Sequence, residues 1–168
     1  MSAKTTSELR DLVRGDVIAP DDAEFEEARK VHNGMIDKRP AVIVRAANAC
    51  DAMTTVNYAR DNGLDLSVRG GGHSGPGFGT NDGGVALDFS RMRGVRVDPN
   101  AQTARAEGGT TWGDFNTATH AFGLATTGGI ISTTGTAGLT LGGGIGYLSR
   151  GCGLSLDNLI SADVVTAD

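Results

Sequence analysis

The chain has 168 residues, with 15 Lys or Arg against 20 Asp or Glu and a formal net charge of −5. This length suits one compact unit with a substantial core, and the acidic balance lacks the basic surface that nucleic-acid binding requires. No stretch reaches the ~18 apolar residues of a membrane span, and the polar amino terminus has no secretory pattern. We therefore expect a soluble, cytoplasmic protein that binds neither nucleic acid nor membrane.

Glycine is abundant and unevenly placed. The 26 glycines are about twice the ~7% of an average protein, and most fall within residues 70–84 and 128–153. Because apolar residues are interleaved with them, these clusters predict ordered loops rather than flexible linkers. The two cysteines, Cys50 and Cys152, show no CxxC pair and no zinc-type Cys/His spacing, so we expect neither a disulfide framework nor a metal site.

In the first half of the chain, short strands alternate with helices. The patterns predict a helical turn at residues 7–13, strands at 16–19, 41–45 and 64–68, and helices over 21–34 and 48–63. Asp21 and Asn48 are the expected N-caps. The second helix is expected to bury Ala49, Met53, Val56 and Ala59 or Arg60. This βαβαβ order predicts a small mixed α/β unit.

Antiparallel structure is expected next. Strands are predicted at residues 84–88, 94–98 and 101–106, the last two joined as a hairpin, followed by a helix capped by Thr110 or Thr111 and ended by Gly123. A last strand is predicted at 159–166. Since domains seldom end within an element, we expect the chain to be the amino-terminal piece of a longer protein, with an edge strand that favours a homodimer.

The most informative segment is LDLSVRGGGHSGPGFG, residues 64–79, in which a strand leads into a glycine loop that carries one histidine. Glycine allows a backbone to approach a ligand closely, and successive main-chain N–H groups form concave anion sites. The row of such groups expected here belongs to Gly70, Gly71, Gly72, His73 and Ser74. The imidazole of His73 would suit proton transfer, nucleophilic attachment or hydrogen bonding.

Other readings of these residues were weighed. Gly70-x-Gly72-x-x-Gly75 fits the dinucleotide fingerprint, with Asp88 near the position of a ribose-binding acid. Pro76 argues against it, because the third glycine should open a helix. Arg69 and Arg150 each border a glycine cluster and are expected either to pair with a phosphate or to be solvated. His32 and His120 are expected in helices, with no special role.

Three segments together carry a family resemblance: VRGGGHSGPGFGTNDGGVALDFSRM, GGIISTTGTAGLTLGGGIGYLSRGCGLSLDNL and ADVVTAD. In this order they resemble the flavoproteins of the vanillyl-alcohol oxidase and p-cresol methylhydroxylase superfamily, most closely the berberine-bridge-enzyme-like branch that includes bacterial nicotine oxidases. The resemblance extends from Gly15 onward. It implies an α+β, two-lobed PCMH-type FAD-binding domain, truncated at its carboxyl end.

From the resemblance we expect a leader at residues 1–14, a βαβαβ FAD-binding lobe at 15–68 and an incomplete, largely antiparallel second lobe at 69–168. The substrate domain would be absent. The implied FAD ligands are Arg69, Gly70, Gly71, Gly72, His73, Ser74, Gly79, Ser132, Thr133, Thr134, Gly135, Gly138, Gly142, Gly143 and Val165. In many members the residue matching His73 is joined to the 8α-methyl carbon of the flavin.

Some relatives carry a second tether, a cysteine at the position that Ile131 occupies here, so the resemblance implies a single covalent link through His73. The function implied is the FAD-binding portion of an oxidoreductase that passes hydride from a small molecule to flavin, with oxygen as the expected acceptor. No catalytic residue can be carried over, and the fragment alone is expected to be inactive. The alternatives are a non-covalent FAD dehydrogenase of the lactone or cell-wall type, and a truncated, non-catalytic flavin-binding module.

Overall fold

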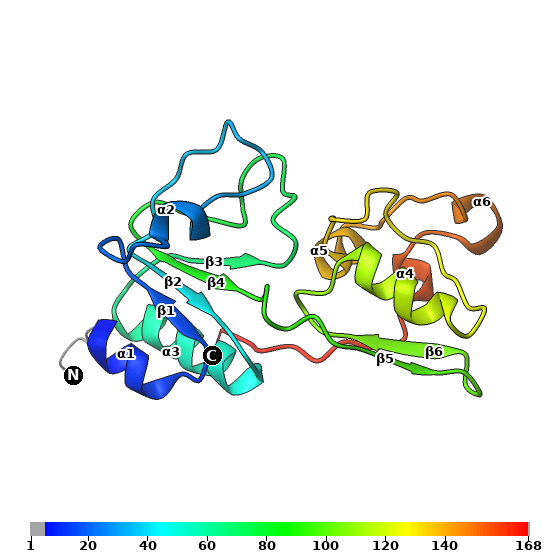
Figure 1. Ribbon diagram of the computed structural model, residues 1–168, viewed down its shortest axis with the longest axis horizontal. Coiled ribbons are helices and arrows are strands. Elements are labelled where there is room, and N and C mark those ends of the chain that lie inside the picture. The colour runs from blue at the N-terminus through cyan, green and yellow to red at the C-terminus, as the bar shows by residue number, and fades with distance from the viewer. Residues whose placement is uncertain (1–5, 168) are drawn as a thin grey trace. The chain divides into compact units, whose positions relative to one another are not determined.

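The computed structural model describes residues 6–167 and separates into two units (Figure 1). Unit 1 contains residues 6–91 with 164–167, and unit 2 contains residues 92–163. The boundary expected after Val68 is corrected, because strand β4 (Val85–Asp88) completes the sheet of unit 1. The expected leader is corrected as well. Its residues 1–5 lie outside the described part, but helix α1 (Thr6–Leu12) buries Leu9 completely.

The sheet of unit 1 has the strand order β1-β2-β4-β3. Strand β1 (Asp16–Ile18) runs antiparallel to β2 (Val42–Arg45), whereas β2, β4 and β3 (Leu66–Arg69) are parallel. Alternate residues of a strand point to opposite faces, and both faces of β2 and β4 are apolar. Such strands need covering on both sides.

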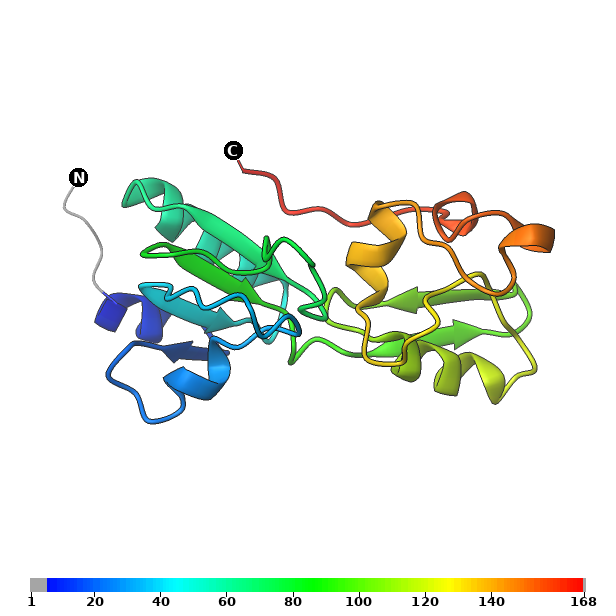
Figure 2. The ribbon, with the colours of Figure 1, turned by 90° about the horizontal axis from the view of Figure 1, so that it is seen from above.

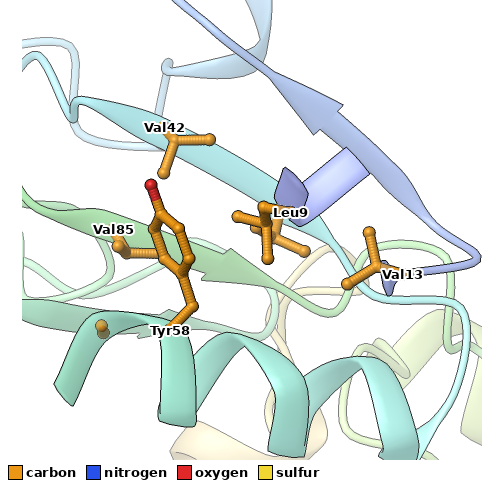
Figure 3. Packing of buried hydrophobic residues seen from close by; sticks show 7 residues of the cluster. Leu9, Val13, Val42, Tyr58 and Val85 are labelled. Carbon is orange, nitrogen blue, oxygen red and sulfur yellow. The ribbon is translucent and has the colours of Figure 1, made fainter. Parts of the chain in front are cut away.

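Helices cover the two faces of this sheet (Figure 1). On one face, α1 and α3 (Ala49–Asp61) bury a cluster of Leu9, Val13, Val42, Val44, Tyr58, Ala59 and Val85. Figure 3 shows the Tyr58 ring reaching from α3 toward Val42 and Val85. On the other face, α2 (Phe25–Ala28) contributes to a cluster of Ile18, Phe25, Ala28, Ile43 and Ala86. The expected mixed α/β unit is therefore confirmed.

Helix α3 has the expected ends but a different buried face. The Asn48 side chain accepts a hydrogen bond from the Asp51 amide, and Gly63, with φ +62°, follows the helix. The residues buried are Asp51, Ala52, Thr55, Tyr58 and Ala59, whereas the expected core residue Met53 is 46% exposed. The face is rotated because the Asp51 carboxylate is drawn inward by the amides of Arg14, Gly15 and Ala47.

The first predicted helix is much shorter than expected. Only Phe25–Ala28 forms α2, its N-cap is Glu24 rather than Asp21, and no side chain caps it. The Asp22 carboxylate instead accepts the Ala19 amide at 2.7 Å. Beyond α2 the chain leaves the helical path because the His32 amide bonds to the Gly72 carbonyl, at 3.1 Å.

Unit 2 contains the expected hairpin and helix. Strands β5 (Val95–Asp98) and β6 (Thr103–Ala106) pair antiparallel, and α4 (Trp112–His120) lies along the hairpin (Figure 2). Three short helical segments follow, α5 (Thr136–Leu141), α6 (Ser149–Cys152) and a 3-10 turn (Leu156–Asn158). The strand predicted at 159–166 is wrong, since residues 159–167 form no strand, so it offers no edge for a dimer. No helix within residues 6–167 is long and apolar enough to cross a membrane.

Helix α4 begins with a capping box that predicts a measurable, pH-dependent contribution to stability. The Thr111 side chain accepts the Asp114 amide, and the Asp114 carboxylate accepts the Thr111 amide. Burial opposes ionisation of Asp114, but hydrogen bonds from Thr111 and Arg93 outweigh it, so the pKa of Asp114 lies below its ordinary value of 3.8. A depressed carboxyl pKa stabilises the fold above the unfolded pKa, and this stabilisation is lost as pH falls through the folded pKa.

We expect Thr111→Ala to lower the free energy of unfolding of unit 2 by about 1 kcal/mol at pH 7. The difference from the wild type should shrink once Asp114 is protonated. Urea denaturation followed by the fluorescence of Trp112, the single tryptophan, measures both values. Thr117→Ala, at an exposed position of the same helix, is the control. Equal midpoints for Thr111→Ala and Thr117→Ala would contradict the assigned cap.

Candidate functional site

The glycine loop, residues 70–79, follows the carboxyl end of β3. Because β3 and β4 are parallel neighbours, the chain must cross back between them, and such a crossover requires a dozen or more residues. Here residues 70–84 make the crossover without a helix, as Pro76 predicted. The loop therefore begins where the parallel strands end, the edge of an α/β sheet at which ligands usually bind.

Main-chain N–H groups of the loop remain available to a ligand. Within residues 6–167, no acceptor is recorded for the amides of Gly70, Gly71, Gly72 and Ser74. Gly72 has φ +71°, a conformation that other residues rarely adopt. Ser74 turns the loop, since its hydroxyl accepts the Phe78 amide at 3.0 Å. These features suit the binding of an anion by successive amides.

The Arg69 side chain has a structural role. It is 6% exposed, and its guanidinium donates to the Asp88 carboxylate at 2.8 Å and to the Ala28 and Lys30 carbonyls at 2.7 and 3.1 Å. Neither expected role, phosphate pairing or surface solvation, fits this burial. Asp88 is 3% exposed and is bound by the same guanidinium, so it cannot act as a ribose-binding acid.

The segment that follows α2 braces the glycine loop, and the two lie side by side (Figures 1 and 2). Besides the bond from His32 to Gly72, the Asn33 side chain donates to the Gly75 carbonyl at 2.9 Å. Gly77, at φ +79°, packs so closely on Ile36 that an added Cβ would lie 2.8 Å from that side chain. Gly79 packs on the aliphatic part of Arg69.

His73 lies in the glycine loop with its ring stacked on that of His32. The ring centroids are 3.9 Å apart and the planes differ by 13°. Burial of the half-buried His73, and then the charge of His32, lower the pKa of His73 below its ordinary value of 6.5. The neutral imidazole is therefore the favoured form at pH 7, and it carries the lone pair that a nucleophile needs.

Sequence reasoning missed His32. It was expected in a helix without a special role, but it lies in an extended connection outside α2. Asn33-Gly34 marked the end of a helix in the sequence, and no local signal related His32 to a loop some forty residues later. Only the bond between the His32 amide and the Gly72 carbonyl reveals the relation.

The second group of expected site residues surrounds α5 in unit 2. The Thr134 and Ser132 carbonyls accept the amides of Trp112 and Gly113, at 2.9 and 2.8 Å. These bonds hold the segment against the start of α4. Thr133 is exposed, Gly135 is the N-cap of α5, Gly138 lies exposed within it and Gly142 is its C-cap. Gly143 follows with φ +105°, so a side chain there would be strained.

The remaining expected features are more scattered. Val165 belongs to unit 1 and is 37% exposed, outside any strand. Cys50 and Cys152 are both free and exposed. Within residues 6–167 no three His, Cys, Asp or Glu side chains are grouped so that they could hold a metal ion.

Comparison with known proteins places these features in context. The model of the family described as FAD binding domain matches residues 40–168. The (R)-6-hydroxynicotine oxidase of Paenarthrobacter nicotinovorans is 41% identical over 99% of the chain. An FAD-linked oxidoreductase of Dictyostelium discoideum is 37% identical over 98%. The chain spans 36% of the length of each of these two relatives.

Solved structures agree with the fold. The crystal structure of 6-hydroxy-D-nicotine oxidase from Arthrobacter nicotinovorans matches 94% of the chain with a TM-score of 0.86 and 39% identity. Berberine-bridge-enzyme-like protein 1 of Physcomitrella patens matches 92% with a TM-score of 0.85 and 27% identity. The chain covers 34% of each of these two structures.

Proposed function

Because this chain belongs to the FAD-binding-domain family, which it matches over residues 40–168, we propose that it is the FAD-binding portion of an oxidoreductase that oxidises a small molecule by hydride transfer. The observation that carries the proposal is the glycine loop, which presents available amides and one imidazole at the carboxyl end of parallel strands. Bound FAD supplies the hydride acceptor, whereas the protein binds, orients and tunes it.

The residues of the glycine loop fit a diphosphate. Residues 66–81 contain no Asp or Glu, and the available amides of Gly70, Gly71, Gly72 and Ser74 complement negative charge. The Arg69 side chain is engaged elsewhere, so its contribution is to hold the loop in place. In unit 2, the segments Ser132–Gly135 and Gly138–Gly143 offer hydroxyl and main-chain groups for the rest of the dinucleotide.

We further infer a single covalent tether through His73. A ring nitrogen of His73 bonds to the 8α carbon of the flavin, His73 and that carbon each lose a proton, and the two electrons pass into the flavin ring. Dioxygen then removes these electrons as hydrogen peroxide, which balances the step. The neutral state favoured for His73 suits this attack. Ile131 stands where some relatives carry a second tethering cysteine, so only one link is expected.

The substrate class follows from the relatives rather than from the site. One relative is named as an oxidase of 6-hydroxynicotine, and a structural neighbour is a chitooligosaccharide oxidase at 25% identity. Both names fit removal of hydride from a C–H bond next to nitrogen or oxygen, with oxygen as acceptor. We propose the same reaction class for the full-length protein. Since the chain spans 36% of its first relative, we expect these 168 residues alone to show little or no turnover.

We expect His73→Ala to lose all acid-stable flavin while it still binds FAD, because the amides that hold the cofactor are unchanged. The chain is purified from a flavin-replete host and precipitated with acid, and flavin fluorescence is measured in pellet and supernatant. Fluorescence should stay with the wild-type pellet and move to the supernatant for His73→Ala. His120→Ala replaces an exposed histidine of α4 and should behave as the wild type.

Two outcomes would favour the alternatives. Wild-type protein that releases all its FAD in acid would overturn the tether and support a non-covalent FAD dehydrogenase. Folded protein that binds no FAD would overturn the proposed cofactor role of this chain.

A further inference from the structure

His32 touches the glycine loop in two independent ways. Its amide donates to the Gly72 carbonyl at 3.1 Å, next to His73 in the chain. Its ring lies parallel to the His73 ring at a centroid distance of 3.9 Å. The first contact fixes the His32 backbone relative to the loop, and the second sets the plane of the neighbouring imidazole.

The backbone that carries His32 is firmly anchored although its side chain is exposed. The buried Arg69 guanidinium donates to the carbonyls of Ala28 and Lys30, and Asn33 donates to Gly75. The residues on either side of His32 are therefore bonded to β3 or to the glycine loop. A ring held by such a backbone is a fixed wall for His73, not a freely moving surface side chain.

We propose that His32 is a positioning residue for His73: its stacked ring holds the imidazole plane in one orientation within the glycine loop and so speeds attachment of the flavin. The gain in rate rests on the covalent tether of the proposed function, but the ordering of His73 does not. Covering one face of the imidazole limits ring rotation, and an ordered nucleophile reacts faster than a mobile one. The same ring disfavours protonation of His73, because two stacked imidazolium ions would repel.

The test compares His32→Ala, which removes the ring, with His32→Phe, which keeps a flat ring without a titrating nitrogen. Protein from riboflavin-depleted cells is mixed with FAD, and acid-stable flavin is followed with time. Attachment should be about two- to tenfold slower in His32→Ala, the range expected for loss of a stacked ring pair, and faster in His32→Phe than in His32→Ala. His120→Ala serves as the histidine control.

A second readout does not depend on flavin. In the flavin-free protein, the His73 imidazole resonances are followed by NMR against pH, and the pKa of His73 should rise toward 6.5 in His32→Ala, because exposure and the loss of the neighbouring charge act together. Unchanged His73 resonances in His32→Ala would overturn the inference. If the wild type forms no acid-stable flavin, the tether fails and the NMR comparison alone decides the role of His32. If the wild type attaches flavin and His32→Ala attaches it at the same rate, the inference fails while the tether stands.

Discussion

Replacing Arg69 with methionine should lower the free energy of unfolding of unit 1 by about 3–5 kcal/mol. Methionine fills a similar volume without a charge, so the Asp88 carboxylate stays buried and loses its nearest cation. Its other basic neighbour, Arg45, lies 3.7 Å away, and the Ser90 amide and hydroxyl alone do not neutralise it. The carbonyls of Ala28 and Lys30 lose their donor as well. Removing one partner of a buried pair costs more than the pair itself contributes.

The measurement must report on unit 1. Trp112 lies in unit 2, so we would follow amide hydrogen exchange of β2 and β4 rather than tryptophan fluorescence. Arg60→Met, at an exposed position paired with Asp61, should change stability by no more than about 0.5 kcal/mol. The double variant Arg69→Met/Asp88→Leu should recover part of the loss, since it removes the unpaired charge. Equal protection in Arg69→Met and Arg60→Met would show that the pair does not hold β3 to β4.

Arg69 also shows where sequence patterns stop being informative. The alternation of Leu64, Leu66 and Val68 predicted β3 and one apolar face, and Leu64 and Leu66 do pack on the core. Yet Val68 is 53% exposed, whereas Ser67 and Arg69 are buried. The buried face of the strand end is polar because Asp88, on the neighbouring strand, pairs with Arg69. A charge pair between residues far apart in sequence leaves no periodic signal.

Local signals, by contrast, predicted local structure well. The Asn48 cap, the Gly63 stop and the Thr111 capping box all depend on residues within a few positions of each other, and all are present. The glycine loop was placed correctly after β3 for the same reason. Its support by the segment after α2 was not foreseen, because a main-chain bond such as that from His32 to Gly72 does not depend on which side chains are present.

The buried face of α3 was misjudged because two polar residues belong to it. Apolar periodicity assigned Met53 and Val56 to the core, whereas Asp51 and Thr55 are 2% and 0% exposed. Thr55 satisfies its hydroxyl on the Asp51 carbonyl. A periodicity argument treats such residues as surface, and only their hydrogen bonds show why the helix turns them inward.

Asp51→Ala should therefore destabilise unit 1 by roughly 3 kcal/mol, since it removes an ionised acceptor from several amides at once. The Asp51 carboxylate accepts Arg14 at 3.0 Å and Gly15 and Ala47 each at 2.9 Å. It thereby ties the turn before β1 and the turn after β2 to the first turn of α3. No other acceptor replaces it, and Gly15 cannot shift easily, because a Cβ there would lie 1.8 Å from the Arg45 carbonyl oxygen.

The series Asp51→Asn, Asp51→Ala and Asp61→Ala separates the carboxylate from helix propensity. Asparagine retains one acceptor oxygen and should lose about half as much stability as alanine. Asp61→Ala, at the last residue of the same helix, should be within about 0.5 kcal/mol of the wild type. Urea denaturation gives the stabilities, and hydrogen exchange at the Gly15 and Ala47 amides locates the loss. Faster exchange at these two amides in Asp51→Ala, ahead of β2, identifies the opened contact. Unchanged exchange there would mean that other groups hold the two turns, and the role assigned to Asp51 would be wrong.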